Sequence, residues 1–156
     1  MLRTALLVCA FALPTGIGAA EPTFSDLLAT PSATDIAARW KSVCFDHAGD
    51  RKSQQAAAKA QNITWPYQAM FLADKGAPSC VIASTTEAST TPEALFDAAA
   101  LSAAPLAPFL RAKKDDQVFG TVTIADKSYR IEAGLHKSPG TLIAVVALTE
   151  VKKDQK

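Results

Sequence analysis

The sequence has few of the residues on which most catalytic and metal sites depend. Its 156 residues include two histidines, three cysteines and seven glycines. It contains no glycine-rich phosphate loop, no G-x-S-x-G nucleophile elbow and no two pairs of metal ligands at finger-like spacing. The 16 basic and 15 acidic residues nearly balance, so the chain lacks the basic excess that nucleic-acid binding requires. The composition therefore predicts no cofactor, no metal and no nucleic-acid partner.

The sequence also lacks a hydrophobic run long enough to cross a bilayer. The N-terminal run covers only residues 5–13, whereas a spanning helix needs about 20 apolar residues. Arg3 precedes this run, and the small residues Gly18 and Ala20 follow it, which is the pattern of a secretory signal peptide. We therefore predict that residues 1–20 are a signal peptide, that cleavage near Ala20 exports the protein to the periplasm or beyond, and that no stable membrane insertion follows.

The chain after residue 20 has a normal size for one domain with its own core. Cleavage would remove Arg3, one of the 16 basic residues, and leave as many basic as acidic residues. The mature protein is then formally neutral. We predict a single α+β domain over residues 21–151 and a disordered polar tail over residues 152–156.

Two cysteines, Cys44 and Cys80, follow the predicted cleavage site. An even number of cysteines in an exported protein favours a disulfide. Cys44 lies in "RWKSVCFDHAGD", four positions after Trp40 on the apolar stripe of a predicted helix. Cys80 lies in the predicted strand "SCVIAST", on the same face as Ile82. A helix packed on a sheet could bring the two sulfurs together, so we predict a bridge between them.

Two other interpretations of Cys44 remain open at this point. With His47 or His136 as its base, Cys44 could act as the nucleophile of a hydrolase or thiol enzyme, although no family signature surrounds it. With His47 it also has the C-x-x-H spacing of a metal site, but it lacks the second pair that such sites use.

Helix starts and strand periodicity predict the fold. The first helix begins at Ser32 or Thr34 and ends at Gly49, the second begins at Asp50 or Ser53 and ends at Asn62, and the third begins at Thr90 or Thr91. The third helix is expected to pack on a sheet through its apolar positions, which are Leu95, Phe96, Ala99 and Leu101.

Alternating residues predict about five antiparallel strands. A hairpin over residues 68–86 turns at Asp74–Gly76, and three strands follow at 117–124, 129–135 and 141–151. The last strand is apolar on both faces and is expected at the centre of the sheet. Residues 111–116 are expected to form a solvated connector. The predicted fold is an α+β domain in which a helix pair and one further helix pack on a sheet ordered β-β-α-β-β-β.

Two groups of residues are candidates for binding. Trp65 and Tyr67 flank a proline and could form a ligand surface, or they could simply cover one end of the core. Arg130, Glu132 and His136 share one face of a predicted strand and could bind a polar group, or they could form ordinary cross-strand charge pairs on a solvated face.

The stretch "CFDHAGDRKSQQAAAKAQNITW" places a cysteine near a helix end, then Gly49 and Asp50, an alanine-rich helix and a tryptophan. In this outline it resembles small uncharacterised exported proteins of Gram-negative, especially alphaproteobacterial, bacteria. The resemblance implies a periplasmic or secreted location and no particular catalytic residue. Together these features lead us to expect a small non-catalytic binding protein with an unknown protein or small-molecule partner, in an oligomeric state that the sequence leaves open.

Overall fold

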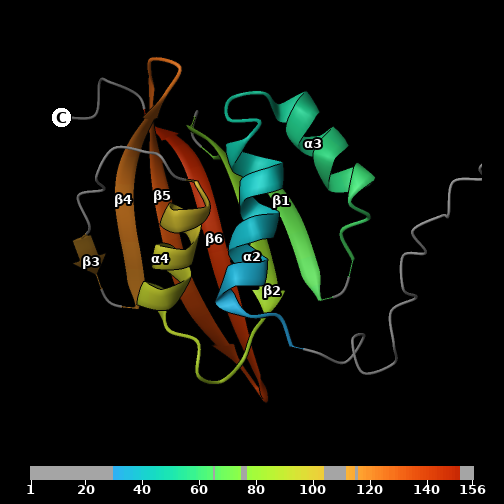
Figure 1. Ribbon diagram of the computed structural model, residues 1–156, viewed down its shortest axis with the longest axis vertical. Coiled ribbons are helices and arrows are strands. Elements are labelled where there is room, and N and C mark those ends of the chain that lie inside the picture. Colours follow the sequence, from blue (N-terminus) through green and yellow to red (C-terminus); the bar gives the residue numbers. More distant parts are fainter. Residues whose placement is uncertain (1–29, 65, 75–76, 104–111, 115, 152–156) are drawn as a thin grey trace, which may run out of the picture.

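The computed structural model describes residues 30–64, 66–74, 77–103, 112–114 and 116–151 (Figure 1). The predictions for the signal peptide, for Trp65, for the hairpin turn after Asp74 and for the tail at 152–156 lie outside the described residues. The elements are α2 (Ala33–Trp40), a π-helical segment η1 (Lys41–Phe45), α3 (Arg51–Ala60), β1 (Tyr67–Asp74), β2 (Ala77–Thr85), α4 (Pro92–Ser102), β3 (Ala112–Lys114), β4 (Gln117–Ile124), β5 (Lys127–Ser138) and β6 (Thr141–Val151).

The predicted α+β class and the predicted order of elements are confirmed. The strands form one sheet in the order β1-β2-β6-β5-β4-β3, and all neighbouring strands pair antiparallel. Strand β6 lies at the centre, as its apolar residues on both faces predict, with Val146 and Ala147 both buried. The short strand β3 is an addition, because its residues were expected to form a solvated connector.

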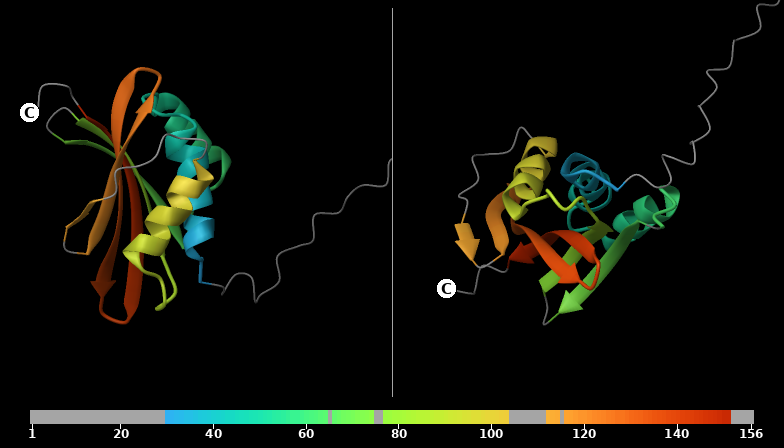
Figure 2. Two further views of the ribbon diagram at one scale, coloured as in Figure 1. Left: turned by 60° about the vertical axis from the view of Figure 1, so that its left-hand side comes forward. Right: turned by 90° about the horizontal axis from the view of Figure 1, so that it is seen from below.

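Helices α2 and α4 lie side by side on one face of the sheet, and α3 lies beyond them near β1 (Figure 2). Apolar side chains from both layers form the core between them. The fully buried large side chains are Trp40, Ile36, Ile82, Leu95, Ile131, Val43, Val118 and Val146. Each belongs to a position that the helical or alternating pattern places on the inner face.

The first helix differs from the single helix that the sequence predicts. It is α-helical only to Trp40, continues as the π-helical segment η1, and leaves helical structure before Gly49, whose φ is +80°. The wider π turn keeps both Val43 and Cys44 directed at the sheet, where neither is exposed to solvent. His47 follows the end of the helical structure and is half-buried.

The prediction for Leu101 was also wrong. The core side of α4 carries Leu95, Phe96 and Ala99, all buried, whereas Leu101 is 79% exposed. Leu101 follows Ala99 by two residues, which is about 200° around an α-helix. It therefore points away from the sheet, despite being apolar.

Three of the predicted helix starts carry side-chain caps. Ser32 forms a reciprocal capping box with Asp35, and the Thr91 hydroxyl accepts a hydrogen bond from the backbone N–H of Ala94. Asp50 caps α3 by accepting from the backbone N–H of Lys52 and of Ser53, both at 3.1 Å, and from the Ser53 hydroxyl at 2.7 Å. These bonds satisfy helix N–H groups that have no partner within the helix.

The cap at Asp50 makes a small part of the stability depend on pH. Hydrogen bonds from the Ser53 hydroxyl and backbone N–H hold the pKa of the Asp50 carboxyl below its ordinary value. A lowered folded-state pKa means that this stabilisation is complete above the carboxyl's pKa in the unfolded chain and is lost as the pH falls through the folded-state value. Asn caps helices about as well as Asp but does not titrate. The Asp50→Asn variant should therefore lose less stability than the wild type between about pH 5 and pH 2.

Urea denaturation at a series of pH values checks this expectation through the difference in free energy of unfolding between the two proteins. A difference that stays constant from neutral to acid pH would contradict it.

Candidate binding site around strand β1

The predicted disulfide between Cys44 and Cys80 is present. The two Cα atoms lie 5.5 Å apart, and the bridge joins η1 to β2. Neither half of the bridge is open to solvent, since Cys44 is 0% and Cys80 2% exposed. In this state the sulfur of Cys44 is neither a thiolate nor a free metal ligand. The stretch at residues 39–50, which contains Cys44, thus has a structural role.

The two histidines lie in different parts of the molecule. His47 is half-buried in the turn after η1, and His136 is exposed near the end of β5. Among the described residues, no group of three or more His, Cys, Asp or Glu side chains is placed to hold a metal ion. No helix within those residues is long and apolar enough to cross a membrane.

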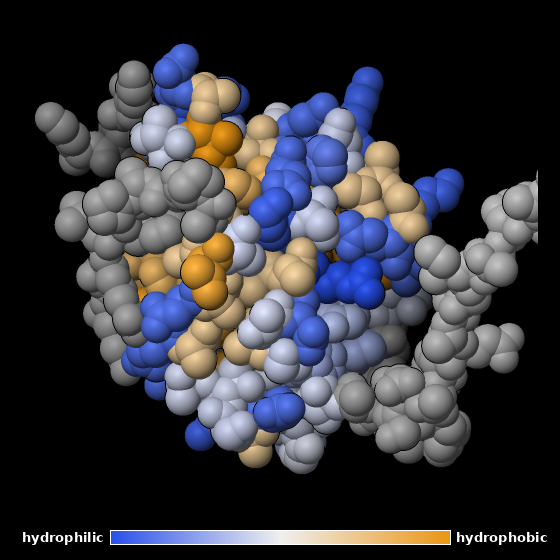
Figure 3. All heavy atoms as spheres, viewed as in Figure 1, coloured by the Kyte–Doolittle hydropathy of each residue, from blue (hydrophilic) through white to orange (hydrophobic). Residues whose placement is uncertain are grey.

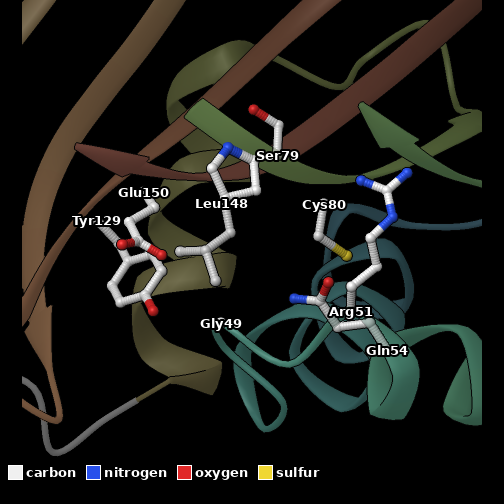
Figure 4. Close-up of a pocket in the computed structure, with 9 residues that line it drawn as sticks. Gly49, Arg51, Gln54, Ser79, Cys80, Tyr129, Leu148 and Glu150 are labelled. Carbon is white, nitrogen blue, oxygen red and sulfur yellow. The ribbon is translucent and has the colours of Figure 1, made fainter. Parts of the chain in front are cut away.

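A small, partly open cavity lies beside the disulfide (Figure 4). Cys80 and Leu148 form part of its wall, Tyr129 and Glu150 stand on one side, and side chains of α3 stand on the other. Its volume of about 30 Å³ is enough for a water molecule but far below the size of a small-molecule site. Burial, followed by the charge of Glu150, raises the pKa of the Tyr129 hydroxyl. A Cβ atom added at Gly49 would lie only 2.7 Å from this hydroxyl. The turn therefore needs glycine because a side chain would collide with Tyr129 and because the φ of Gly49 is positive.

Tyr67, one of the two predicted binding residues, stands at the start of β1. The guanidinium of Arg39 lies 5.2 Å from the centre of its ring. Burial and the charge of Asp35 raise the pKa of its hydroxyl, and Arg39 acts in the opposite direction. The ring is only half-buried, so Tyr67 both covers one end of the core and remains accessible.

A polar hollow of about 300 Å³ lies on the helix side of Tyr67. Within it, the Gln61 side-chain carbonyl accepts from Arg39 at 3.1 Å and from the Ser42 hydroxyl at 3.2 Å. We call it the Tyr67 hollow; it is lined by Asp35, Ala38, Arg39, Ser42, Gln61 and Tyr67. The Gln61 amide, which is a neutral group, holds the Arg39 side chain in place.

A second hollow, of about 350 Å³, continues along the same side of β1. Tyr67, Ala69 and Phe71 occupy every second position of β1, so their side chains lie on the same face of the strand. These side chains pack against the edge of the core. We call this hollow the β1 groove; it is lined by Ala58, Lys59, Asn62, Ile63, Ala69 and Phe71. Its opposite wall is the end of α3 and the residues that follow it.

A third hollow, of about 230 Å³, lies at the Tyr67 end of β1 and opens mainly on the face of the sheet opposite the helices. Gln68, Ala83 and Ile143 contribute to it from three neighbouring strands, and Pro66 and Tyr67 form its rim. Three hollows therefore border β1, two on its helix side and one mainly on the opposite face, and Tyr67 belongs to two of them.

Arg51 marks the other end of the β1 groove. From the first turn of α3, its guanidinium donates to the backbone carbonyls of Phe71 and of Leu72, and it lies 5.8 Å from the centre of the Phe71 ring. On the helix-bearing surface, hydrophobic side chains are exposed over α4, and hydrophilic side chains are mixed with apolar ones over α3 (Figure 3). The region around β1 thus combines an apolar floor with a charged rim.

The second predicted group of binding residues is not brought together. Arg130 pairs with Glu132 at 2.6 Å and lies 4.3 Å from the centre of the Phe119 ring, whereas His136 lies farther along β5. The Arg130–Glu132 ion pair lies along one strand, β5, rather than across two strands, and the contact between Arg130 and Phe119 is the one that crosses to β4.

Tyr67 could be chosen as a candidate from the sequence, but the β1 groove could not. Its residues come from an alanine-rich helix, a loop and a strand, and none carries a distinctive motif. The available signal was the mainly polar composition of residues 51–60, which indicates a helix that buries little of its surface. Comparison of the chain with protein-family models, with curated proteins and with solved structures found no match.

Proposed function

We propose that this protein is an exported, non-catalytic binding protein whose binding site surrounds strand β1. The observation that carries the proposal is that three hollows border this strand, two on the helix side and one mainly on the opposite face, and that two of them share Tyr67. Small binding sites are concave and mainly apolar, with a few fixed polar groups. Tyr67 and Phe71 supply apolar surface there, and Arg39 supplies a fixed charge.

The disulfide supports this proposal because it stabilises the wall of the site. Cys80 pairs directly with Phe71 across the β1–β2 ladder, and Cys44 belongs to the segment against which α3 packs, where the Gln54 amide donates to the Cys44 carbonyl at 3.3 Å. The bridge thus ties together the two sides of the β1 groove. The signal-peptide pattern and the resemblance to exported Gram-negative proteins support an export route to a compartment in which such a bridge forms.

Export is tested by recovering the protein from its native host and determining its N-terminal sequence. We expect the periplasmic or secreted protein to begin at Glu21. Recovery of the uncleaved chain from the cytoplasm alone would contradict the proposal.

Binding is tested by NMR with small organic probes, namely phenol, isopropanol and acetate, added to the isotopically labelled oxidised protein. The amide signals that shift most should belong to residues 58–63 and 66–71. Shifts concentrated on β4 and β5, or none beyond those of a solvent control, would overturn the proposed site.

The alternative of a hydrolase or thiol enzyme that uses Cys44 makes an opposite prediction about alkylation. In the bridged protein we expect iodoacetamide to add no mass until a reductant opens the disulfide, after which two labels should be added. Labelling of Cys44 without reduction would favour the enzyme.

A further inference from the structure

We propose that the β1 groove binds an extended, acidic segment of a partner polypeptide, which adds to the sheet as a strand beside β1. This inference rests on the proposed function. Strand addition of this kind obtains affinity from main-chain hydrogen bonds and specificity from pockets that receive alternate side chains. The described residues supply an open strand edge, a groove and a matching charge.

The edge comes from the position of β1 in the sheet. Strand β1 is the first in the strand order and pairs only with β2 among the described strands. The Phe71 carbonyl accepts from Arg51 and therefore points away from β2. Since pairing alternates along an antiparallel strand, Ala69, two residues earlier, also directs its N–H and carbonyl outward. The same parity applies to Tyr67, whose N–H bonds to the Thr64 carbonyl at 2.7 Å.

Arg51 sets one end of the usable edge. Its guanidinium donates to the outward-facing Phe71 carbonyl, where a charged side chain protects an edge strand against unspecific pairing. The usable stretch lies between this carbonyl and the Tyr67 N–H, which bonds to Thr64; it covers five residues of β1, or about 15 Å at the rise of a strand. It matches a segment of about five residues, of which two or three direct their side chains to the helix side.

The groove would receive those side chains. Helix α3 packs mainly against η1, and its buried residues are Gln54 and Ala58. It therefore leaves the β1 groove open, with Ala58 and Ile63 on one wall and Ala69 and Phe71 on the other. A strand paired with β1 would place every second side chain between these walls. Apolar side chains fit this lining.

The charge around the groove selects an acidic segment. Arg39 and Arg51 stand at its two ends, and Lys59 is part of its lining. The bonded partners of the two arginines are neutral: the Gln61 amide for Arg39, and backbone carbonyls for Arg51. Among the described residues, none of these three cations takes part in an ion pair. Carboxylates of a bound segment would be attracted to these charges, which are only partly screened at physiological salt.

The test begins with a library of random heptapeptides displayed against the oxidised full mature protein. We expect enriched peptides to combine apolar residues at alternate positions with at least one Asp or Glu. A synthetic peptide from the selection should slow hydrogen exchange at the Ala69 amide, because that N–H becomes bonded. N-methylation at alternate peptide nitrogens should weaken binding about tenfold or more, as expected for the loss of main-chain hydrogen bonds.

Two variants of α3 separate the groove from the general charge of the helix. Lys59→Glu reverses a charge inside the groove, and Lys52→Glu makes the same change in net charge outside its lining. Lys59→Glu should weaken peptide binding about tenfold, and Lys52→Glu should change it by less than about twofold. Circular dichroism confirms that both variants are folded.

Equal weakening by the two variants, unchanged exchange at Ala69, or insensitivity to N-methylation would overturn strand addition. An empty selection, together with small organic probes that still bind at residues 58–71, would also overturn it, because the site would then belong to a small molecule and the proposed binding function would stand. Failure of both peptides and probes would remove the proposed function itself.

Discussion

Replacing Cys44 and Cys80 together by alanine should lower the midpoint of thermal unfolding by about 10–20 °C. The bridge joins residues 36 positions apart, and the loss of a cross-link over such a loop costs about 3.5–4 kcal/mol in the chain-entropy model. A domain of this size has a total stability of about 5–15 kcal/mol, and each kcal/mol corresponds to a few degrees. The disulfide therefore supplies a large share of the domain's free energy of unfolding.

Calorimetry of the oxidised wild type and the double variant measures this effect. The reduced wild type serves as the control, because it loses the bridge while keeping both side chains, and its midpoint should fall close to that of the variant. A midpoint within about 3 °C of the oxidised wild type would mean that packing around the bridge, rather than the cross-link, stabilises the domain.

The sequence predicted those parts of the fold that local chemistry determines. Ser32, Asp50 and Thr91 start helices because each offers a side-chain oxygen to free N–H groups. Asn62, with a φ of 45°, ends the second helix in a conformation that Asn tolerates better than most residues. The strands followed from alternation, and the central place of β6 followed from its apolar residues on both faces.

Features that depend on distant contacts could not be predicted in this way. The change to a π-helix after Trp40 serves to bury both Val43 and Cys44 against a sheet formed later in the chain. The strand at 112–114 exists only because β4 offers it an edge.

The candidate site shows the same division. Tyr67 could be selected from the sequence because an aromatic residue after a proline is a visible signal. The β1 groove could not, because it arises where α3 stops packing against the sheet and leaves Ala69 and Phe71 with a partly open side. That β1 is an edge strand depends on the pairing of β2 with β6, about 65 residues apart in sequence.

Replacing Trp40 by alanine should destabilise the domain by about 3–5 kcal/mol. Trp40 is the largest of the fully buried side chains, with 0% of its surface exposed. The centre of its ring lies 5.6 Å from the centre of the Phe45 ring. Trp40 ends α2 where the π-helical segment begins, so a cavity there would loosen both the helix layer and the segment that carries Cys44. Urea denaturation of the oxidised protein gives the change in free energy of unfolding directly.

The matched control is Trp40→Phe, which separates the ring from its N–H group. The indole nitrogen of Trp40 is buried without a hydrogen-bond partner among the described residues, and burying such a donor costs about 1–3 kcal/mol. Phenylalanine removes this cost while keeping much of the apolar ring, so the two effects oppose each other, and the net loss should stay below about 1.5 kcal/mol. If Trp40→Phe proves as destabilising as Trp40→Ala, the indole N–H must be bonded in solution, and a bound water becomes part of the core.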